Sequence, residues 1–358
     1  MDAEGLVSGV LRDDADGGRR GLRAASSPRL FAALQNNYGI EKADDACDLG
    51  GSSSLNLLVV GDEGRCVARV YRPYVTAARL EDVQRVRRRL AAGGIPCSEL
   101  IRTRDGQSWI TLDDRLVEVE RYVAHDAVMN SWERVGAALP LLGRMHALLR
   151  GGVTVGTEGK NPVFANYVAP QNALAQTLRG AQRIRAWGPS ANELRLAHAA
   201  DGLARRLDAA ERAFVPLLPR QLTHGDFWDD NVFFRDNDVA LVADFDFLGE
   251  RARIDDLALT LYYAHVAFSE NFPSNDAPQR LRGLVDAYER GLGESLSWAE
   301  RAALPLAIAR QPLWSIGGWV ALLDDEERAR QHAARMYDEV ERALQIVREI
   351  EKWQAAFA

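Results

Sequence analysis

The chain has 358 residues, of which 47% are hydrophobic, and this is enough to build two packed lobes or domains. Its formal net charge is −7 and its basic residues are interspersed with acids, which argues against a general nucleic-acid-binding or membrane-binding surface. The three cysteines lack CxxC spacing, which argues against a disulfide framework and a zinc site. Small molecules and metal ions remain as the expected partners.

The first 27 residues hold acids, glycines and arginines, with no sustained hydrophobic period and no long apolar run. This composition predicts a flexible tail over 1–27, and neither a signal peptide nor a membrane span. We therefore expect a cytoplasmic protein with no membrane partner and no nucleic-acid partner. Monomer and homodimer both stay open.

Residues 28–121 are predicted to form a small β-rich lobe that contains one long helix. A short helix begins at Pro28 and is followed by two strands, 55–60 and 66–71, joined by the turn "GDEG". Apolar residues at helical spacing then predict a helix over 76–92, and further strands continue to about residue 120. The arginine run of that helix is most simply its solvated face: Arg85, Arg87, Arg88 and Arg89.

Residues 122–358 are predicted to form a mostly helical lobe. The longest periodic stretches are 132–149, 171–187, 192–217 and several segments after residue 254. A β-hairpin with strands at 231–235 and 239–243 interrupts this helical pattern.

Polar residues gather at the open end of this hairpin. Asn231 follows Asp226 by five residues, and Asp244 comes directly after the second strand. Because a hairpin returns its second strand beside its first, Asn231 and Asp244 should be neighbours, with Asp226 just outside. Carboxylate and amide oxygens are the ligands that Mg²⁺ prefers, and the remaining carboxylate can accept a proton. This spacing is that of a kinase catalytic loop followed by a metal-binding aspartate.

The sequence resembles the aminoglycoside phosphotransferase and choline kinase-like family, which includes homoserine kinase type II and bacterial stress-response kinases. The resemblance covers about residues 28–260 and is carried by "YGI...LGGSSSLN...CVARVYRP", "LGRMH", "LTHGDFWDDNVFF" and "LVADFDFLGERARIDDLAL". It implies an α+β, two-lobed, protein-kinase-like fold that uses ATP or GTP with magnesium. Carried over by position, it makes Asp226 the catalytic base and Asn231 and Asp244 the magnesium ligands. His224 and Asp256 would support the catalytic loop.

The nucleotide side is predicted from weaker signals. A stretch of small residues leads into the first long strand: Gly51, Ser52, Ser53, Ser54 and Asn56. Small side chains would let its backbone N–H groups approach the phosphates of a nucleotide, although the stretch also suits a tight turn. Arg69 stands where protein kinases have a lysine, and either Glu81 or Asp82 is its expected partner. The backbone of the linker between the lobes is expected to bond adenine: Glu120, Arg121 and Tyr122.

Acids and aromatic residues near Asp226 suit an amino-bearing or sugar-like acceptor, because carboxylates pair ammonium groups and aromatic rings attract cations. The candidates are Trp228, Asp229, Asp230, Asp246, Trp314 and Trp319. The alternative is that these tryptophans belong to the core and the acids are solvated.

Three functions follow from this pattern. The first is a small-molecule O-kinase whose acceptor is an antibiotic, an aminoglycoside-like compound or an amino alcohol, with antibiotic resistance as one such role. The second is a stress-response-type protein Ser/Thr kinase, which the lack of an arginine before Asp226 and of an "APE" segment after Asp244 disfavours. The third, a nucleotide-binding pseudokinase, is disfavoured by the intact Asp226, Asn231 and Asp244.

Overall fold

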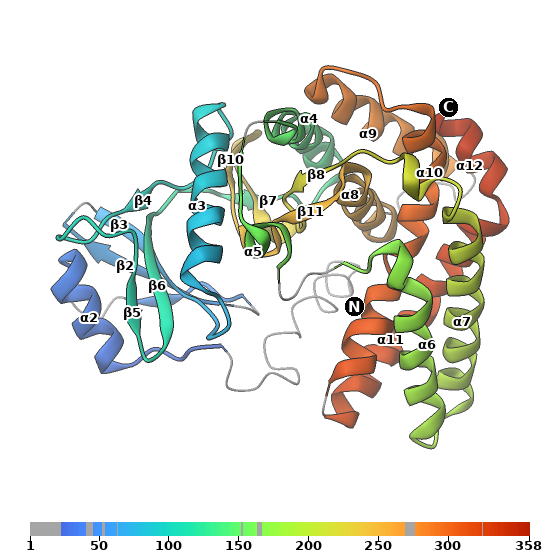
Figure 1. The fold of residues 1–358 in the computed structure, drawn as a ribbon, viewed down its shortest axis with the longest axis horizontal. Coiled ribbons are helices and arrows are strands. Elements are labelled where there is room, and N and C mark those ends of the chain that lie inside the picture. Colours follow the sequence, from blue (N-terminus) through green and yellow to red (C-terminus); the bar gives the residue numbers. More distant parts are fainter. Residues whose placement is uncertain are drawn as a thin grey trace.

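The structure is a computed structural model. It has two lobes, one built on a β-sheet and one mostly helical (Figure 1). It describes residues 23–40, 46–51, 54–62, 64–151, 153–162, 167–268, 276–323 and 325–358. The tail predicted over 1–27 therefore lies outside the described residues up to residue 22.

The N-terminal lobe is an antiparallel sheet in the order β1-β2-β3-β6-β4, with β5 pairing β6 on the side. Its strands are β1 (Cys47–Asp48), β2 (Leu55–Gly61), β3 (Gly64–Val70), β4 (Leu100–Ile101), β5 (Ile110–Leu112) and β6 (Arg115–Arg121). Helix α2 (Pro28–Tyr38) covers one face, where Leu30 and Leu34 pack against alternate residues of β2, β3 and β6. This alternation fixes the register, since a slip of one residue would turn every apolar side chain to the other face.

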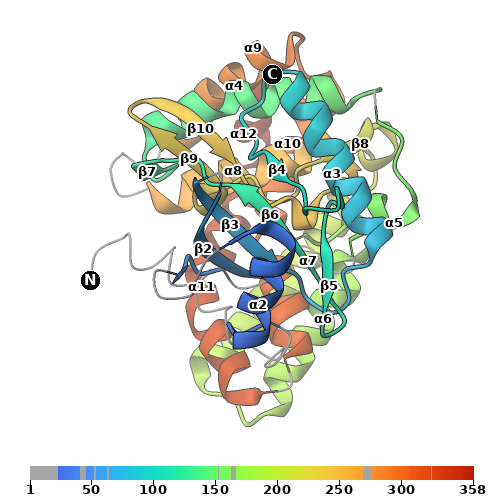
Figure 2. The same cartoon turned by 90° about the vertical axis from the view of Figure 1, so that its left-hand side faces the viewer.

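Helix α3 (Ala77–Ala92) lies between the sheet and the helical lobe (Figures 1 and 2). Val83, Val86 and Leu90 recur at helical spacing and join the core of the C-terminal lobe. Arg79 also reaches that lobe, where it donates hydrogen bonds to the main-chain oxygens of Glu158, Gly159, Asp246 and Leu248.

The prediction of a fully solvated arginine run on α3 is wrong at one position. Arg87 is buried and forms ion pairs with Glu118 and Glu120 on β6. Its place on the helix explains this, because it stands four residues after Val83 and three before Leu90, on the face that turns inward. The other three arginines of the run are exposed, as predicted.

The C-terminal lobe packs helices around one continuous apolar core, and α4 lies against α9 while α6, α7 and α11 lie side by side (Figure 1). The longer helices are α4 (Trp132–Leu149), α6 (Pro170–Ala186), α7 (Ala191–Glu211), α8 (Arg253–Ala267), α9 (Ala277–Leu292), α10 (Trp298–Arg310) and α11 (Glu326–Arg348). Shorter ones are α5 (Thr157–Lys160), η3 (Val215–Leu217), η4 (Asp229–Asn231), η5 (Phe245–Phe247), the π-helix η8 (Ser315–Val320) and α12 (Ile350–Phe357). None of the helices in the described ranges is both long and apolar enough to cross a membrane.

Two small sheets sit in this lobe and face the N-terminal lobe. The predicted hairpin is present as β9 (Val232–Arg235) and β10 (Asp238–Val242), with β7 (Ala127–Val128) as a third strand. Beside it, β8 (Arg220–Thr223) pairs with β11 (Gly249–Ala252). The loop that follows β8 and the turn that follows β10 therefore start from neighbouring sheets.

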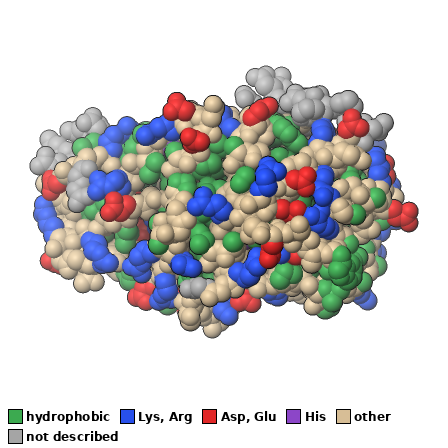
Figure 3. Space-filling model, turned by 90° about the horizontal axis from the view of Figure 1, so that it is seen from above, with side chains coloured by type: hydrophobic (Ala, Val, Ile, Leu, Met, Phe, Trp, Pro, Cys, Tyr) green, Lys and Arg blue, Asp and Glu red, His purple; other side chains and the backbone are tan. Residues whose placement is uncertain are grey.

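Charges on the surface are mixed. Seen from above, Lys and Arg side chains alternate with Asp and Glu over both lobes, and no face-wide patch of one sign appears (Figure 3).

Candidate active site

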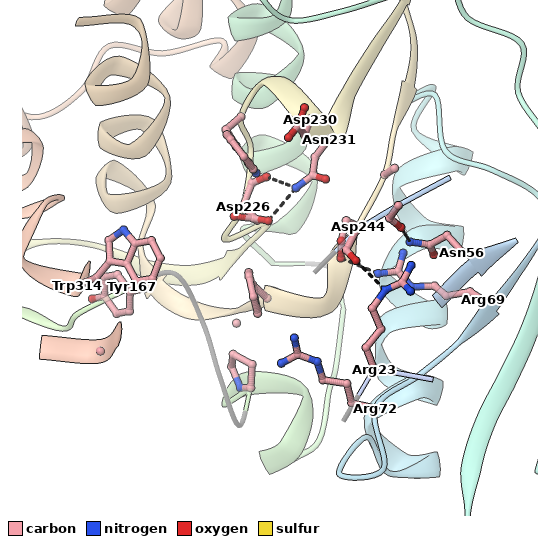
Figure 4. Close-up of a pocket in the computed structure, with 18 of the residues that line it drawn as sticks. Arg23, Asn56, Arg69, Arg72, Tyr167, Asp226, Asp230, Asn231, Asp244 and Trp314 are labelled. Carbon is pink, nitrogen blue, oxygen red and sulfur yellow. Dashed lines mark hydrogen bonds and ion pairs between the residues drawn. The ribbon is translucent and has the colours of Figure 1, made fainter. Parts of the chain in front are cut away.

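A cavity of about 1420 Å³ lies between the two lobes, and most of the predicted site residues line it (Figure 4). Lining residues from the predicted set are Gly51, Asn56, Arg69, Glu120, Arg121, Tyr122, Asp226, Trp228, Asp230, Asn231, Asp244, Trp314 and Trp319. Ser52 and Ser53 lie outside the described residues.

The loop after β8 is held by a buried carboxylate. Asp256, on α8, accepts hydrogen bonds from the main-chain N–H groups of His224 and Gly225 at 2.9 and 2.8 Å. His146 Nε2 lies 3.1 Å from the same carboxylate. Burial opposes ionisation of Asp256, but the hydrogen bond from His146 and the nearby positive charges outweigh it, so the pKa of Asp256 is lowered.

Gly225 is required by the shape of this loop. Its φ of +84° lies in the left-handed region, and a Cβ there would stand 2.3 Å from the main-chain oxygen of Phe247. Only glycine allows this approach.

The tautomer of His224 follows from its partners. Nε2 donates to the main-chain oxygen of Ala243 at 2.9 Å, and Nδ1 accepts from the N–H of Asp226 at 3.2 Å. Burial lowers the pKa of His224, so the ring is neutral at pH 7. His224 thus joins the Asp226 loop to the strand end that carries Asp244.

Asn231 and Asp226 are joined by two hydrogen bonds. The Asn231 Nδ2 group donates to the main-chain oxygen of Asp226 at 2.9 Å and to its carboxylate Oδ2 at 2.8 Å (Figure 4). Because the amide nitrogen is used in this way, the Asn231 Oδ1 atom is directed elsewhere and is available as a ligand. The same bonds fix the orientation of the Asp226 carboxylate.

Asp244 has a left-handed backbone, with φ at 57°, which aspartate and asparagine tolerate better than most residues. Its Oδ1 atom accepts from Arg69 Nη2 at 2.8 Å, and the same Nη2 lies 3.0 Å from Asp246 Oδ2. Burial lowers the pKa of Arg69, but these two carboxylates outweigh it and the pKa is raised. A single cationic group therefore sits between two carboxylates at this strand end.

The predicted pairing of Arg69 with Glu81 or Asp82 is wrong. Glu81 is exposed, while the Asp82 carboxylate binds Arg85 and accepts from the N–H of Gly156 at 2.8 Å. Arg69 instead crosses to the other lobe, and the acids that it meets lie 175 and 177 positions later in the chain.

The glycine-rich turn is stabilised by side chains around it. Asn56 Nδ2 donates to Gly50 O at 3.0 Å, and Gly51 has a φ of +103°. Arg23 Nε donates to Gly51 O at 2.8 Å, so the end of the predicted tail belongs to this site. Ser54 Oγ donates to Asp246 Oδ2 at 3.3 Å, which links the turn to the Asp244 side.

The apolar part of the cavity, lined by Leu49, Val67, Phe233 and Leu241, suits a flat base. The predicted linker Glu120, Arg121 and Tyr122 borders it, but two of its amides are occupied. Arg121 N donates to Glu99 O at 2.8 Å and Tyr122 N to Arg65 O at 3.1 Å, so these N–H groups are not available to adenine. Any main-chain bond from this linker to adenine would therefore have to use other groups than these two, and the prediction is narrowed to those other groups.

Glu120 provides a pH test of this region. Burial raises the pKa of Glu120 to about 7, and the adjacent Glu118 carboxylate adds to this against the attraction of Arg87. The folded protein therefore binds more protons than the unfolded chain between the ordinary carboxyl pKa and about 7, and this group makes stability fall as pH rises through that window.

We expect Glu120→Gln, which mimics the protonated acid, to be more stable than the wild type above pH 7 by about 1 to 3 kcal/mol. The difference should shrink as the pH falls and vanish below the ordinary carboxyl pKa, where Glu120 is neutral in the folded and in the unfolded chain. Thermal unfolding of both proteins across this range is the measurement, and parallel curves would contradict the assignment.

The predicted acceptor residues separate into two groups. Trp228, Asp230, Trp314 and Trp319 line the cavity. Asp229 does not, because it is buried and accepts from Tyr263 Oη at 3.1 Å and from the N–H of Asp230 at 2.9 Å. Asp246 also turns away, toward Arg69 and Ser54. These two acids have structural partners, which corrects their place in the acceptor set.

Tyr167 and Arg251 also line the cavity, and no sequence pattern pointed to either of them. The π-helix η8 widens the backbone where Trp314 and Trp319 meet the cavity, and such helices occur often at functional sites. Trp314 and Tyr167 line the same cavity (Figure 4), and the guanidinium of Arg251 lies 4.6 Å from the centre of the Tyr167 ring. These residues come from separate segments, so only the fold brings them together.

Comparison with known proteins gives a family and a fold. A sequence profile of the group described as "Phosphotransferase enzyme family" matches residues 48–304. Homoserine kinase of Rhodopseudomonas palustris strain TIE-1 is 28% identical over 273 residues, which cover 72% of this chain and 72% of that protein.

Solved structures agree on the fold. A microcompartment-associated aminopropanol kinase has a TM-score of 0.66 at 19% identity, and covers 90% of this chain and 98% of its own. An amicoumacin kinase in complex with AMP-PNP and Ca²⁺ has a TM-score of 0.63 at 14% identity, with 92% and 94% covered. These likenesses confirm the predicted two-lobed, protein-kinase-like fold.

Proposed function

Because the chain belongs to the phosphotransferase enzyme family and is thus a small-molecule phosphotransferase acting on hydroxyl groups, we propose that it transfers the γ-phosphoryl group of magnesium-bound ATP or GTP. The acceptor is a hydroxyl of a small molecule, with antibiotics, aminoglycoside-like compounds and amino alcohols as the first candidates. The aminopropanol and amicoumacin kinases among the similar structures support this set.

The observation that carries the proposal is the convergence of Asp226, Asn231 and Asp244 on one side of the cavity (Figure 4). The Asp226 carboxylate, oriented by Asn231, takes the proton of the acceptor hydroxyl. The acceptor oxygen forms a bond to the γ-phosphorus, the bond from that phosphorus to the β–γ bridging oxygen breaks, and the nucleoside diphosphate leaves with the electron pair. Positioning and charge neutralisation supply most of the catalysis.

The residues present fit a divalent cation. Arg69 places a positive group within 2.8 Å of Asp244 and 3.0 Å of Asp246, which supports a preference for positive charge at this strand end. Asn231 and Asp244 are the proposed ligands, since magnesium needs few protein oxygens when phosphates supply others. When bound, the ion would neutralise charge on the β- and γ-phosphates.

The proposal is tested by incubating the protein with Mg²⁺ and either ATP or GTP, together with panels of antibiotics, amino alcohols and metabolites. Mass spectrometry should detect a product heavier by one phosphoryl group, in amounts matched by nucleoside diphosphate. Failure to phosphorylate any compound in panels that include protein substrates would contradict the function.

Asp244→Asn tests the metal ligand without straining the backbone, because asparagine tolerates the left-handed φ of 57°. We expect the Mg²⁺ concentration needed for half-maximal nucleotide binding to rise about 10-fold or more, because one of two protein ligands loses its charge. Binding is followed by titration calorimetry at several Mg²⁺ concentrations. Unchanged magnesium dependence would remove Asp244 from the metal site.

A further inference from the structure

The part of the cavity away from the nucleotide is rich in cationic side chains. It is bordered by β8, β11, α6 and residues 160–162 of the C-terminal lobe, and by the end of β3 from the N-terminal lobe. The basic residues that line it are Arg72, Lys160, Arg179, Arg220 and Arg251, and the acids are Asp226, Asp230 and Glu250. A site for a purely cationic acceptor would be expected to show the opposite balance.

Part of this charge is neutralised within the protein. Lys160 Nζ lies 3.1 Å from the Glu250 carboxylate, and Arg220 donates to the Glu250 main-chain oxygen at 2.8 Å. Asp226 is the proposed base. Neither Arg179 nor Arg251 forms a direct ion pair within the described residues, so these two arginines are the ones that can bind a ligand.

Arg251 is the central residue of this group. Its side chain is 4% exposed, and its contacts within the described residues are a hydrogen bond of 2.7 Å to the Phe247 main-chain oxygen and the Tyr167 ring. A Cβ placed on Gly225 would lie 2.7 Å from Arg251 Nη2, so the guanidinium rests against the Asp226 loop. Arg251 lies near the buried Asp256 carboxylate, whose pKa it helps to lower, but it forms no direct ion pair within the described residues. Its guanidinium can therefore still bind an anionic ligand, which would offset part of the cost of burying the charge.

Two further arginines border the same space. Arg72, at the end of β3, is 6% exposed and extends toward the cavity between Asp244 and Tyr167 (Figure 4). Arg179, on α6, is exposed and has no ion-pair partner within the ranges that the structure describes. Planar guanidinium groups bind carboxylate and phosphate oxygens through paired hydrogen bonds.

We propose that the acceptor carries an oxyanion, a carboxylate or a phosphate monoester, near the hydroxyl that is phosphorylated, and that Arg251 and Arg179 bind it. This inference rests on the proposed function and adds a requirement to the acceptor. An amino group on the same molecule remains compatible, because Asp230 lines the same space.

The test uses hydroxyl compounds in matched pairs, with Mg²⁺ and ATP: homoserine and its amide, 4-hydroxybutanoate and its amide, and glycerol 3-phosphate and glycerol. 3-Amino-1-propanol, which is homoserine without its carboxylate, serves as the amine-only probe. In each pair, the member with the carboxylate or phosphate should be phosphorylated with a kcat/KM about 10-fold or more above the member without it, as loss of one charged hydrogen bond implies. The pairs also separate carboxylate from phosphate recognition.

Arg251→Gln and Arg179→Gln assign the preference to residues. Each should raise the KM for the anionic acceptor, by about 10- to 100-fold at Arg251, and leave the KM for ATP within about twofold. Arg179 is exposed, so its variant keeps the test valid if Arg251→Gln impairs folding. Arg212→Gln, an exposed arginine on the turn after α7, is the matched control for charge and should change neither KM.

The outcomes separate the two proposals. Equal use of both members of each pair, or preference for the neutral or amine-only compounds, overturns the oxyanion inference and leaves phosphotransfer standing. A preference for anions that survives both arginine variants overturns their assignment. If the wild type phosphorylates no member of any pair and no compound of the wider panels, the proposed function itself fails.

Discussion

Replacing Asp226 with asparagine is expected to lower kcat by about 100- to 10,000-fold, because the hydroxyl loses the group that takes its proton. Asparagine keeps the size of the side chain and an oxygen that can accept the hydrogen bond from Asn231 Nδ2. The Kd for Mg·ATP should therefore stay within a few-fold of the wild type. Steady-state kinetics and titration calorimetry give the two numbers.

Asp236→Asn is the matched control, since it makes the same chemical change at the tip of the neighbouring hairpin. Asp236 is exposed and has a φ of 56°, which asparagine accepts, so neither activity nor stability should change measurably. Undiminished turnover in Asp226→Asn would show that another group takes the proton. An equal loss in both variants would point to a general effect on the hairpin.

Asp256→Asn is expected to reduce the free energy of unfolding by about 3 kcal/mol or more. The aspartate accepts from the N–H groups of His224 and Gly225 and also lies against His146 Nε2. Asparagine has only one oxygen, and its NH₂ group would face a buried donor. One donor would then be left without a partner, and the Asp226 loop would lose its support.

Chemical denaturation measures this loss, and amide hydrogen exchange at His224 and Gly225 locates it. Asp238→Asn, at an exposed strand end, is the control and should leave both measurements unchanged. Activity should fall together with protection of the loop. Normal protection in Asp256→Asn would mean that the strand pairing of β8 with β11 alone holds the loop.

The sequence predicted those parts of the structure that depend on neighbouring residues. Helix α4 spans the predicted 132–149, because Ser131 caps its first turn and apolar residues recur at helical spacing. The hairpin brought Asn231 and Asp244 to one end for the same local reason. Helix α7 ends at Glu211 instead of 217, since Pro216 lies in a separate turn, η3.

Long-range contacts were beyond such reasoning. The sequence offered Glu81 and Asp82 as partners of Arg69 because they are near in the chain, and no local pattern shows that Arg69 meets acids of the other lobe. The cationic lining of the cavity could not be predicted either. Its residues Arg72, Arg179 and Arg251 come from three distant segments and share no motif. Only the tertiary fold brings them to one cavity. The tertiary fold also gives Asp229 its buried hydrogen-bond partners.

The bonds of Arg79 bear on how the two lobes are kept in register. Every hydrogen-bond acceptor that Arg79 has in the C-terminal lobe is a neutral main-chain oxygen, and the side chain is buried. Dissolved salt screens the attraction between exposed charges, with a screening length of about 10 Å at 0.1 M. It has little effect on buried hydrogen bonds to uncharged carbonyl groups. Helix α3 should thus keep its place against the C-terminal lobe at high ionic strength.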